Sequence, residues 1–326
     1  MALSDLAVYS EYAYSTMTET LQQQVDLFNA ATNGAILLRS AAHQGDFSDI
    51  AFFQKIDGLI RRRNAYADTA IAQKVLKQIV DTMVKIGTGT AEIRLDPGQF
   101  KWIQMNPEVA GAALGQQLAV DTMADMLNTA LGATRAALIQ TPEVVYDITG
   151  ETSPGDEVSF KAMTKATGKF GDAGSRIAAW VMHSKPLFDL YANALTNSER
   201  LFTYGDVIVS RDPFGKLMVM TDSPALVDTV TTPSDPIYTS LGLTQGAIIV
   251  DQNNDYTAAE DTQTGYENIR RTFQAEWSYE LGVKGYSWDK SNGGKSPTNA
   301  ALLTSTNWDK YSTSHKDLAG VLLKSH

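Results

Sequence analysis

The longest regular pattern along the chain lies between Asn106 and Pro142, where apolar residues recur mostly every three or four positions. This spacing predicts an α-helix of roughly 33 residues, about 50 Å long at a rise of 1.5 Å per residue. The mean globular helix has only about 11–12 residues, so such a rod requires an unusual architecture. Its apolar positions, which predict a narrow stripe of coiled-coil type, are Val109, Ala113, Val120, Met123, Leu127, Leu131, Thr134 and Leu138.

Boundary signals mark both ends of this helix. We expect the Asn106 side chain to accept a free backbone N–H of the first turn. Pro107 suits the first helical position, because its missing N–H removes no hydrogen bond there. Pro142 ends the pattern, since the residue before a proline is driven out of helical geometry.

The interior of the helix contains Gly111, Gly115 and Gly132 and very little charge. Each glycine costs about 1 kcal/mol relative to alanine in a helix interior. The sequence therefore predicts that another backbone packs close to these positions. A solvent-exposed helix normally carries more Lys and Glu on its polar faces, so we expect several faces of this helix to be covered.

A second long pattern, within residues 266–288, alternates apolar and polar side chains. The apolar set is Ile269, Phe273, Ala275, Trp277, Tyr279, Leu281 and Val283, and the polar set is Arg270, Thr272, Gln274, Glu276, Ser278, Glu280 and Lys284. Alternation over about 15 residues predicts a strand about 50 Å long, with one buried and one solvated face. Two elements of matched length predict an elongated platform in which the helix lies along the strand.

Shorter patterns organise the remaining chain. Residues 1–45 show helical spacing of apolar residues, with Gly34 as a stop signal. Residues 46–75 predict a long hairpin or extended loop that contains the basic run Arg61–Arg63. The range 151–265 has an α/β pattern, with a buried strand in SRIAAWVMHS, an amphipathic helix in KPLFDLYANAL, and strands in YGDVIVS and KLMVMTD.

Composition narrows the class of protein. The 326 residues include 27 Lys and Arg against 37 Asp and Glu, which gives a net charge of −10. This balance argues against a nucleic-acid reader, which usually carries a basic footprint. The chain has no cysteine, so disulfides, thiolate metal sites and cysteine nucleophiles are excluded. The first residues lack the basic region of a secretory signal, and no apolar run approaches the ~20 residues of a membrane helix.

Local motifs for chemistry each miss a defining residue. NGGKS resembles the end of a phosphate-binding loop, but Asp289 stands where the full motif needs Gly. DQNND at 251–255 resembles a calcium loop, but Tyr256 and Thr262 occupy positions that need Gly and Glu. The run HSK at 183–185 is not expected to form a triad, because adjacent strand residues point to opposite faces. We therefore expect no catalytic, cofactor or metal site.

The order of these elements resembles the major capsid protein of a tailed bacteriophage with the Hong-Kong-97-type fold. The segments that carry the resemblance are HQGDFSDIAFFQKI, GLIRRRNAY, AAWVMHSKPLFDL, YGDVIVS, LGLTQGAIIV, IRRTFQAEWSYELGVKGYSW and SPTNAALLTSTNW. The resemblance implies an α+β fold with an arm, an extended loop (the E-loop), a peripheral domain and an axial α/β domain. The implied ranges are an N-terminal arm at 1–45, the E-loop at 46–75, a peripheral domain at 76–150 and 266–295 with the spine helix at 106–141, an axial domain at 151–265, and a C-terminal segment at 296–326.

The resemblance also implies a structural protein of the virion, not an enzyme. Hexamers and pentamers would close into an icosahedral head around double-stranded DNA, without sequence-specific DNA contact and without a membrane. Assembly would take place in the bacterial host cytoplasm, with a portal, a separate scaffolding protein and a decoration protein as further partners. Two alternatives stay open, namely a cellular encapsulin-like nanocompartment shell of the same fold and an acidic cytosolic enzyme of unrecognised class.

The E-loop supplies the candidate contacts between subunits. Arg61, Arg62 and Arg63 fit a solvated turn, a clamp onto acidic residues of a neighbouring subunit or, less well, a nucleic-acid contact. The candidate acidic partners are Asp251, Asp255, Glu260 and Asp261. Some members of the family crosslink a loop lysine to an asparagine of another subunit, and Lys55 lies in the matching loop. Charge reversal of all three arginines should impair assembly and leave the fold intact.

Overall fold

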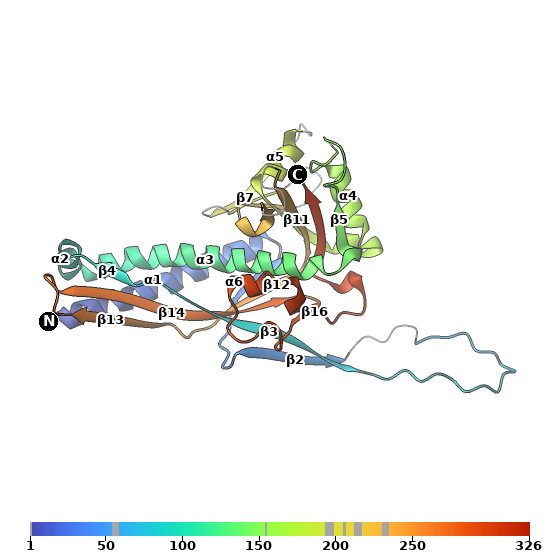
Figure 1. Cartoon of the computed structure of the whole chain (residues 1–326), viewed down its shortest axis with the longest axis horizontal. Helices are drawn as coiled ribbons and strands as arrows, with labels where there is room; N and C mark the ends of the chain where they lie inside the picture. The colour runs from blue at the N-terminus through green and yellow to red at the C-terminus, as the bar shows by residue number, and fades with distance from the viewer. Residues whose placement is uncertain are drawn as a thin grey trace.

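The computed structural model describes residues 2–53, 59–153, 155–192, 199–204, 207–211, 217–229 and 235–326. Within these ranges the chain forms two lobes, each built on one β-sheet (Figure 1). The first lobe is an elongated platform of a nine-stranded sheet and long helices, and the second lobe contains an eight-stranded sheet. A search of the described helices finds none with the length and apolar character needed to cross a membrane.

The predicted long helix is α3 (Pro107–Ile139), which has 33 residues and Pro107 at its first position. The capping prediction is wrong, because the Asn106 side chain accepts no backbone N–H. Asn106 instead joins α3 directly to α2 (Pro97–Met105), with its backbone N–H bonded to the Trp102 carbonyl and its own carbonyl bonded to Ala110. Its ψ of 64° lies outside the extended geometry of a normal N-cap.

Burial changes along α3, so the predicted narrow stripe is wrong. Val109 and Val120, which were assigned to the stripe, are 61% and 39% exposed. From Thr129 to Leu138, by contrast, every residue except Arg135 is buried. The cause is visible in Figure 1, where the second lobe lies above the C-terminal half of α3 and the nine-stranded sheet lies below it.

The first helix, α1 (Ala2–Ala31), lies along the N-terminal half of α3 and explains its glycines. A Cβ atom at Gly111 would lie 2.5 Å from the Tyr9 carbonyl oxygen. A Cβ atom at Gly115 would overlap the Ala13 carbonyl oxygen and lie 2.9 Å from Thr16 Cβ. The predicted close approach of another backbone is therefore confirmed at these two glycines, and the partner is a helix of the same chain.

The nine-stranded sheet is organised around the long strand β14 (Arg270–Val283). Its other strands are β1 (Ile36–Ser40), β2 (Phe47–Phe53), β3 (Gln78–Gly89), β4 (Ile93–Leu95), β12 (Ile248–Gln252), β13 (Thr257–Gln263), β15 (Tyr286–Trp288) and β16 (Trp308–Lys310). The β14 strand pairs antiparallel with β3, β4, β12, β13 and β15, and β1 runs parallel to β12.

The predicted alternation of β14 holds only in its first half. Phe273 and Ala275 are buried, and Gln274 and Glu276 between and beside them are exposed. From Trp277 onwards both faces are buried, so the expectation of one wet face is wrong there. The polar face is covered by a turn of the chain, in which Asn253 and Asp255 bond to Ser278, and by Met83, which packs against Gly282.

The second sheet has the strand order β5-β17-β11-β6-β9-β8-β7, with β10 paired to β11. Its strands are β5 (Val145–Asp147), β6 (Ile177–Met182), β7 (Glu199–Tyr204), β8 (Val207–Arg211), β9 (Leu217–Thr221), β10 (Val227–Asp228), β11 (Ile237–Thr244) and β17 (Gly320–Ser325). The lobe also contains α4 (Phe160–Gly168) and α5 (Ser184–Ala192). As predicted, β6 is a buried strand and is followed by the helix α5.

Sheet membership departs from the implied domain ranges at two places. The strands β12 and β13 fall within 151–265, yet they pair with β14 in the first sheet. The C-terminal strand β17 lies between β5 and β11, inside the second sheet. The remaining elements are α6 (Asn299–Leu302) and short 3-10 helices at Pro142–Val144, Gly171–Arg176, Pro224–Leu226, Ser305–Asn307 and His315–Asp317.

Candidate intersubunit surface

The β2–β3 hairpin carries a loop that projects from the body of the subunit (Figure 1). The hairpin register runs from Phe47 opposite Val84 to Phe53 opposite Gln78, and residues 59–77 continue beyond it. The exposed apolar side chains of this loop are Leu59, Ile60, Tyr66, Ile71, Val75 and Leu76. Ile60 and Tyr66 are 96% and 98% exposed. Such a concentration of exposed apolar side chains is typical of a protein–protein contact.

The three arginines lie on this loop, and all three are exposed. Within the described parts of the chain, Arg61, Arg62 and Arg63 form no ion pair. Their positive charge is therefore open to a partner outside the chain. Lys55, the candidate for a crosslink, lies outside the described residues.

Two of the four candidate acidic partners are already bonded to cations within the subunit. Asp251 accepts two hydrogen bonds of 2.7 Å from the Arg39 guanidinium. Asp255 accepts a hydrogen bond from the Ser278 backbone N–H at 2.9 Å and forms an ion pair with Lys85 at 3.1 Å. Burial alone would raise the pKa of Asp255, but the bonds from Ser278 and Lys85 hold it below its usual value. An incoming arginine would therefore compete with internal bonds at both positions.

The other two candidates lie on β13 and differ in environment. Glu260 is partly buried, burial raises its pKa, and its Oε1 atom has no hydrogen-bond partner among the described residues. Asp261 is exposed and accepts a hydrogen bond from Gln263. Of the four candidates, Asp261 is thus the most accessible to an outside cation.

Sequence reasoning missed an acidic pocket between α3 and the first sheet. The pocket has a volume of about 440 Å³ and is lined by Thr88, Gly89, Thr90, Ala91, Ile93, Leu114, Gln117, Leu118, Asp121, Thr122, Asp125 and Trp277. Asp125 accepts a hydrogen bond from Tyr279 at 3.1 Å, and burial raises the pKa of Asp125. No lysine or arginine is among the lining residues. The signal in the sequence was the pair Asp121 and Asp125, one turn apart on a helix with little other charge.

A second group of exposed apolar residues lies at the end of the platform opposite the projecting loop (Figure 1). Trp102 and Met105 come from α2, and Val109 comes from the first turn of α3. Tyr266 and Ile269 come from the turn between β13 and β14. The subunit therefore exposes apolar side chains at both ends of its long axis.

The HSK run lies at a strand-to-helix junction, so the argument from adjacent strand residues does not apply. Ser184 is the first residue of α5, and its hydroxyl lies 3.3 Å from His183 Nδ1. Asp222 lies 3.5 Å from His183 Nε2 and also accepts a hydrogen bond from the Ser184 backbone N–H. Lys185 forms an ion pair with Asp189. The group fastens the start of α5 to the end of β9.

A family model described as Gp13-like, Major capsid protein 13-like, matches residues 5–322. The chain belongs to this family. Major capsid proteins of the 13-like family are structural components of phage capsids, so the chain is a virion protein and the two alternative functions are not favoured. A comparison with curated protein sequences finds no match.

Three solved phage structures are similar to this chain. The capsid of Ralstonia phage GP4 superposes with a TM-score of 0.50 at 8% identity, over 90% of this chain and 88% of that chain. The cyanophage Pam1 capsid asymmetric unit gives a TM-score of 0.48 at 11% identity, over 76% and 84%. The head of Helicobacter pylori bacteriophage KHP40 gives 0.48 at 9% identity, over 90% and 88%. The predicted α+β fold of the Hong-Kong-97 type is confirmed.

Proposed function

We propose that this major capsid protein assembles as hexamers and pentamers into an icosahedral head that encloses viral double-stranded DNA. The observation that supports it most directly is the projecting loop at 59–77, whose apolar and arginine side chains are exposed. Exposure of the apolar side chains of this loop to water is unfavourable. Their burial against a second copy of the chain lowers the free energy. Repeating one such contact around a ring produces a closed assembly.

In this proposal Arg61, Arg62 and Arg63 form a clamp on acidic side chains of the neighbouring copy. The pocket that contains Asp121 and Asp125 suits these arginines better than Asp251 and Asp255 do, because it holds no cation of its own. Asp261 and Glu260 remain further candidates. An exposed pair contributes only about 0.2–1 kcal/mol, so the clamp forms reversibly until many contacts accumulate.

The two lobes correspond in this proposal to the two domains of the shell subunit. The nine-stranded sheet with α1–α3 would form the peripheral domain, including β12 and β13. The eight-stranded sheet would form the axial domain, with β17 as an integral strand. The net charge of −10 limits adhesion to packaged DNA, which would contact the inner wall without sequence specificity. Assembly would occur in the bacterial host cytoplasm, with a portal, a separate scaffolding protein and a decoration protein as partners.

Electron microscopy of the full chain, expressed alone and together with its phage's other head proteins, tests the proposal. We expect closed shells with hexamers and pentamers from the wild-type chain. The variant R61D/R62D/R63D should give a folded subunit that sediments as a small species. A matched control, K161D/K169D/K310D, reverses three exposed lysines away from the loop and should still assemble. Normal shells from the arginine variant would exclude the clamp, and only small wild-type oligomers under every condition would contradict shell assembly.

A further inference from the structure

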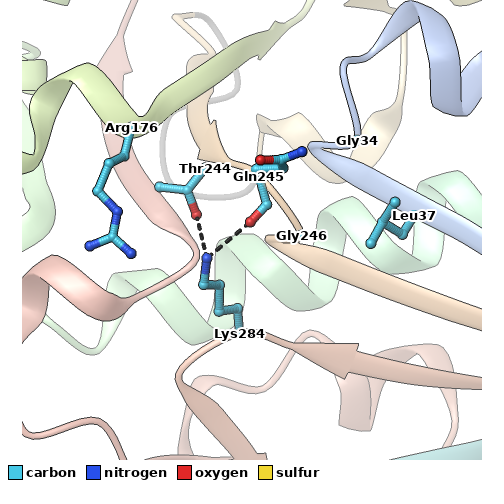
Figure 2. A pocket seen from close by; sticks show the side chains of 7 residues that line it. All are labelled: Gly34, Leu37, Arg176, Thr244, Gln245, Gly246 and Lys284. Carbon is cyan, nitrogen blue, oxygen red and sulfur yellow. Dashed lines mark hydrogen bonds between the residues drawn. The ribbon is translucent and has the colours of Figure 1, made fainter.

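A pocket of about 520 Å³ opens where the two lobes meet (Figure 2). Gly34 and Leu37 reach it from the connection between α1 and β1 and from β1 itself. Thr244, Gln245 and Gly246 belong to the end of β11 and its turn into β12. Arg176 precedes β6 in the second sheet, and Lys284 follows β14 in the first sheet. The pocket is thus built from both sheets.

The lining of this pocket is cationic, although the chain as a whole is acidic. Its seven residues include Arg176 and Lys284 and no carboxylate. The Lys284 ammonium donates hydrogen bonds to the Gln245 carbonyl oxygen at 2.9 Å and to Thr244 Oγ1 at 3.4 Å, and both acceptors are neutral (Figure 2). Within the described residues Lys284 forms no salt bridge, whereas Arg176 contacts Asp317 at 3.2 Å. One positive charge in the pocket therefore has no bonded carboxylate.

The two cations also affect each other. Burial and the positive charge of Arg176 lower the pKa of Lys284, and the negative charge of Asp317 offsets this only in part. An anion in the pocket would oppose both effects, because it would attract the buried ammonium and neutralise the repulsion from the guanidinium. The pocket thus favours an anion over a cation or a purely apolar ligand.

We propose that this pocket binds a phosphate group, with Lys284 and Arg176 as its two cationic contacts. A guanidinium presents a planar set of donors that matches the oxygens of phosphate, and an ammonium adds a compact charge. The Gln245 side chain lines the pocket and offers a neutral amide donor. The volume falls in the range of about 300–1,000 Å³ that is usual for ligand sites, so the phosphate can be free or part of a nucleic-acid backbone.

Because the ligand would touch both sheets, its binding would hold the two lobes together. This inference does not depend on shell assembly, since it concerns a pocket within one subunit. It is therefore tested on the unassembled full-length chain, and its failure would leave the proposed function untouched.

Residue-specific amine labelling of the wild-type chain is the first experiment. Acetic anhydride labels the neutral form of each lysine, and mass spectrometry reports the rate at each site. Inorganic phosphate should slow the labelling of Lys284 several-fold, whereas Lys295, which pairs with Asp46 outside the pocket, should keep its rate. Sodium chloride of equal ionic strength should have no such effect. Equal protection of both lysines, or protection by chloride, would overturn the proposal.

Thermal unfolding of variants is the second experiment. Inorganic phosphate should raise the melting temperature of the wild type and of the control K295Q by the same amount, and should have little effect on K284Q or R176Q. In the labelling experiment, a short DNA duplex is compared with inorganic phosphate. Protection of Lys284 by duplex at lower phosphate concentration would identify a nucleic-acid phosphate, and protection by inorganic phosphate alone would identify a free anion. A wild-type response in both K284Q and R176Q would refute the site.

Discussion

Asp251 on β12 and Glu280 on β14 lie directly opposite each other, and both carboxylates are buried. They are the centre of a row of four charged residues, in which Arg39 faces Asp251 and Lys85 faces Glu280. Like charges in directly opposed positions destabilise a sheet. Asp251 is compensated by two bonds from Arg39, whereas among the described residues Glu280 has an ion pair with His43 at 3.6 Å and no hydrogen bond to its Oε1 atom.

Replacing Glu280 by glutamine should therefore stabilise the subunit at neutral pH. Burial and Asp251 raise the pKa of Glu280 despite the opposing effects of His43 and Lys85, so the fold disfavours its charged form. We expect E280Q to raise the free energy of unfolding by about 1 kcal/mol, because glutamine keeps the shape of the side chain and removes a buried charge. The gain should shrink as the pH falls, because Glu280 then becomes neutral in the wild type.

Urea unfolding of the unassembled subunit measures this effect. The matched control is E276Q, which changes an exposed glutamate on the same strand and should stay within about 0.5 kcal/mol of the wild type. A loss of stability in E280Q at neutral pH would show that the attraction to His43 and Lys85 outweighs burial.

The stability of the subunit should also depend on pH through Asp81, which lies at the base of the projecting loop. It lies on β3 and accepts a hydrogen bond from the Tyr311 hydroxyl at 3.0 Å, and burial raises its pKa from 3.8 to about 6. The folded chain thus binds this proton more tightly than the unfolded chain does. The contribution of Asp81 to stability should rise as the pH falls through about 6 and level off below the unfolded value.

The variant D81N should remove this contribution to the pH dependence. It should be more stable than the wild type near pH 8, by about 3 kcal/mol, and roughly half of this difference should be lost by pH 5. Unfolding curves at the two pH values give the comparison, and the exposed Asp261→Asn variant serves as the control. Parallel pH profiles for D81N and the wild type would contradict the assigned pKa.

The long helix and the long strand could be predicted because their signals are local. Pro107 starts α3 where expected, and buried and exposed residues alternate along β14 from Phe273 to Glu276. The covering of their other faces could not be predicted, because it depends on distant segments. The turn that contains Asn253 covers Ser278, and α1 covers Gly111, which lies about a hundred residues further along the chain.

At the candidate site, too, features set by the nearby sequence could be predicted, and contacts between distant residues could not. The exposure of Arg61 and its neighbours follows from their charge and their place in a predicted extended loop, and the structure agrees. The engagement of Asp251 with Arg39 joins residues 212 positions apart, and no sequence pattern connects them. Asp121 and Asp125 were overlooked because an i, i+4 acid pair on a helix is usually a solvated face, and only the fold places them in a pocket.

Close packing of α1 on α3 predicts that alanine at Gly115 is destabilising. Alanine would gain about 1 kcal/mol of helix propensity, but its Cβ atom would overlap the Ala13 backbone. Overpacking of this kind costs about 1–3 kcal/mol, so G115A should lower the melting temperature and expose α1 to proteolysis. The control is G98A on α2, where an added Cβ atom meets nothing within 4 Å and should be neutral or slightly stabilising. Equal effects at the two glycines would argue against the close contact.

A charge exchange between subunits tests the acidic pocket as the receiver of the loop arginines. Asp121 is exposed on α3, so D121K should leave the fold intact. If Arg61–Arg63 of a neighbouring copy approach this carboxylate, D121K should reduce the yield of shells several-fold, because like charges now meet. The control D309K reverses another exposed aspartate and should assemble normally.

The decisive measurement is the combination of D121K with R61D/R62D/R63D. Each change alone puts like charges into the contact, whereas the combination restores opposite charges with their positions exchanged. Shell yield from the combination, measured by sedimentation and electron microscopy, should exceed the yield from either parent. A combination that assembles no better than its worse parent would show that the arginines do not bind at this pocket. It would favour Asp261 on β13, which is exposed and accepts a hydrogen bond from the neutral Gln263 side chain.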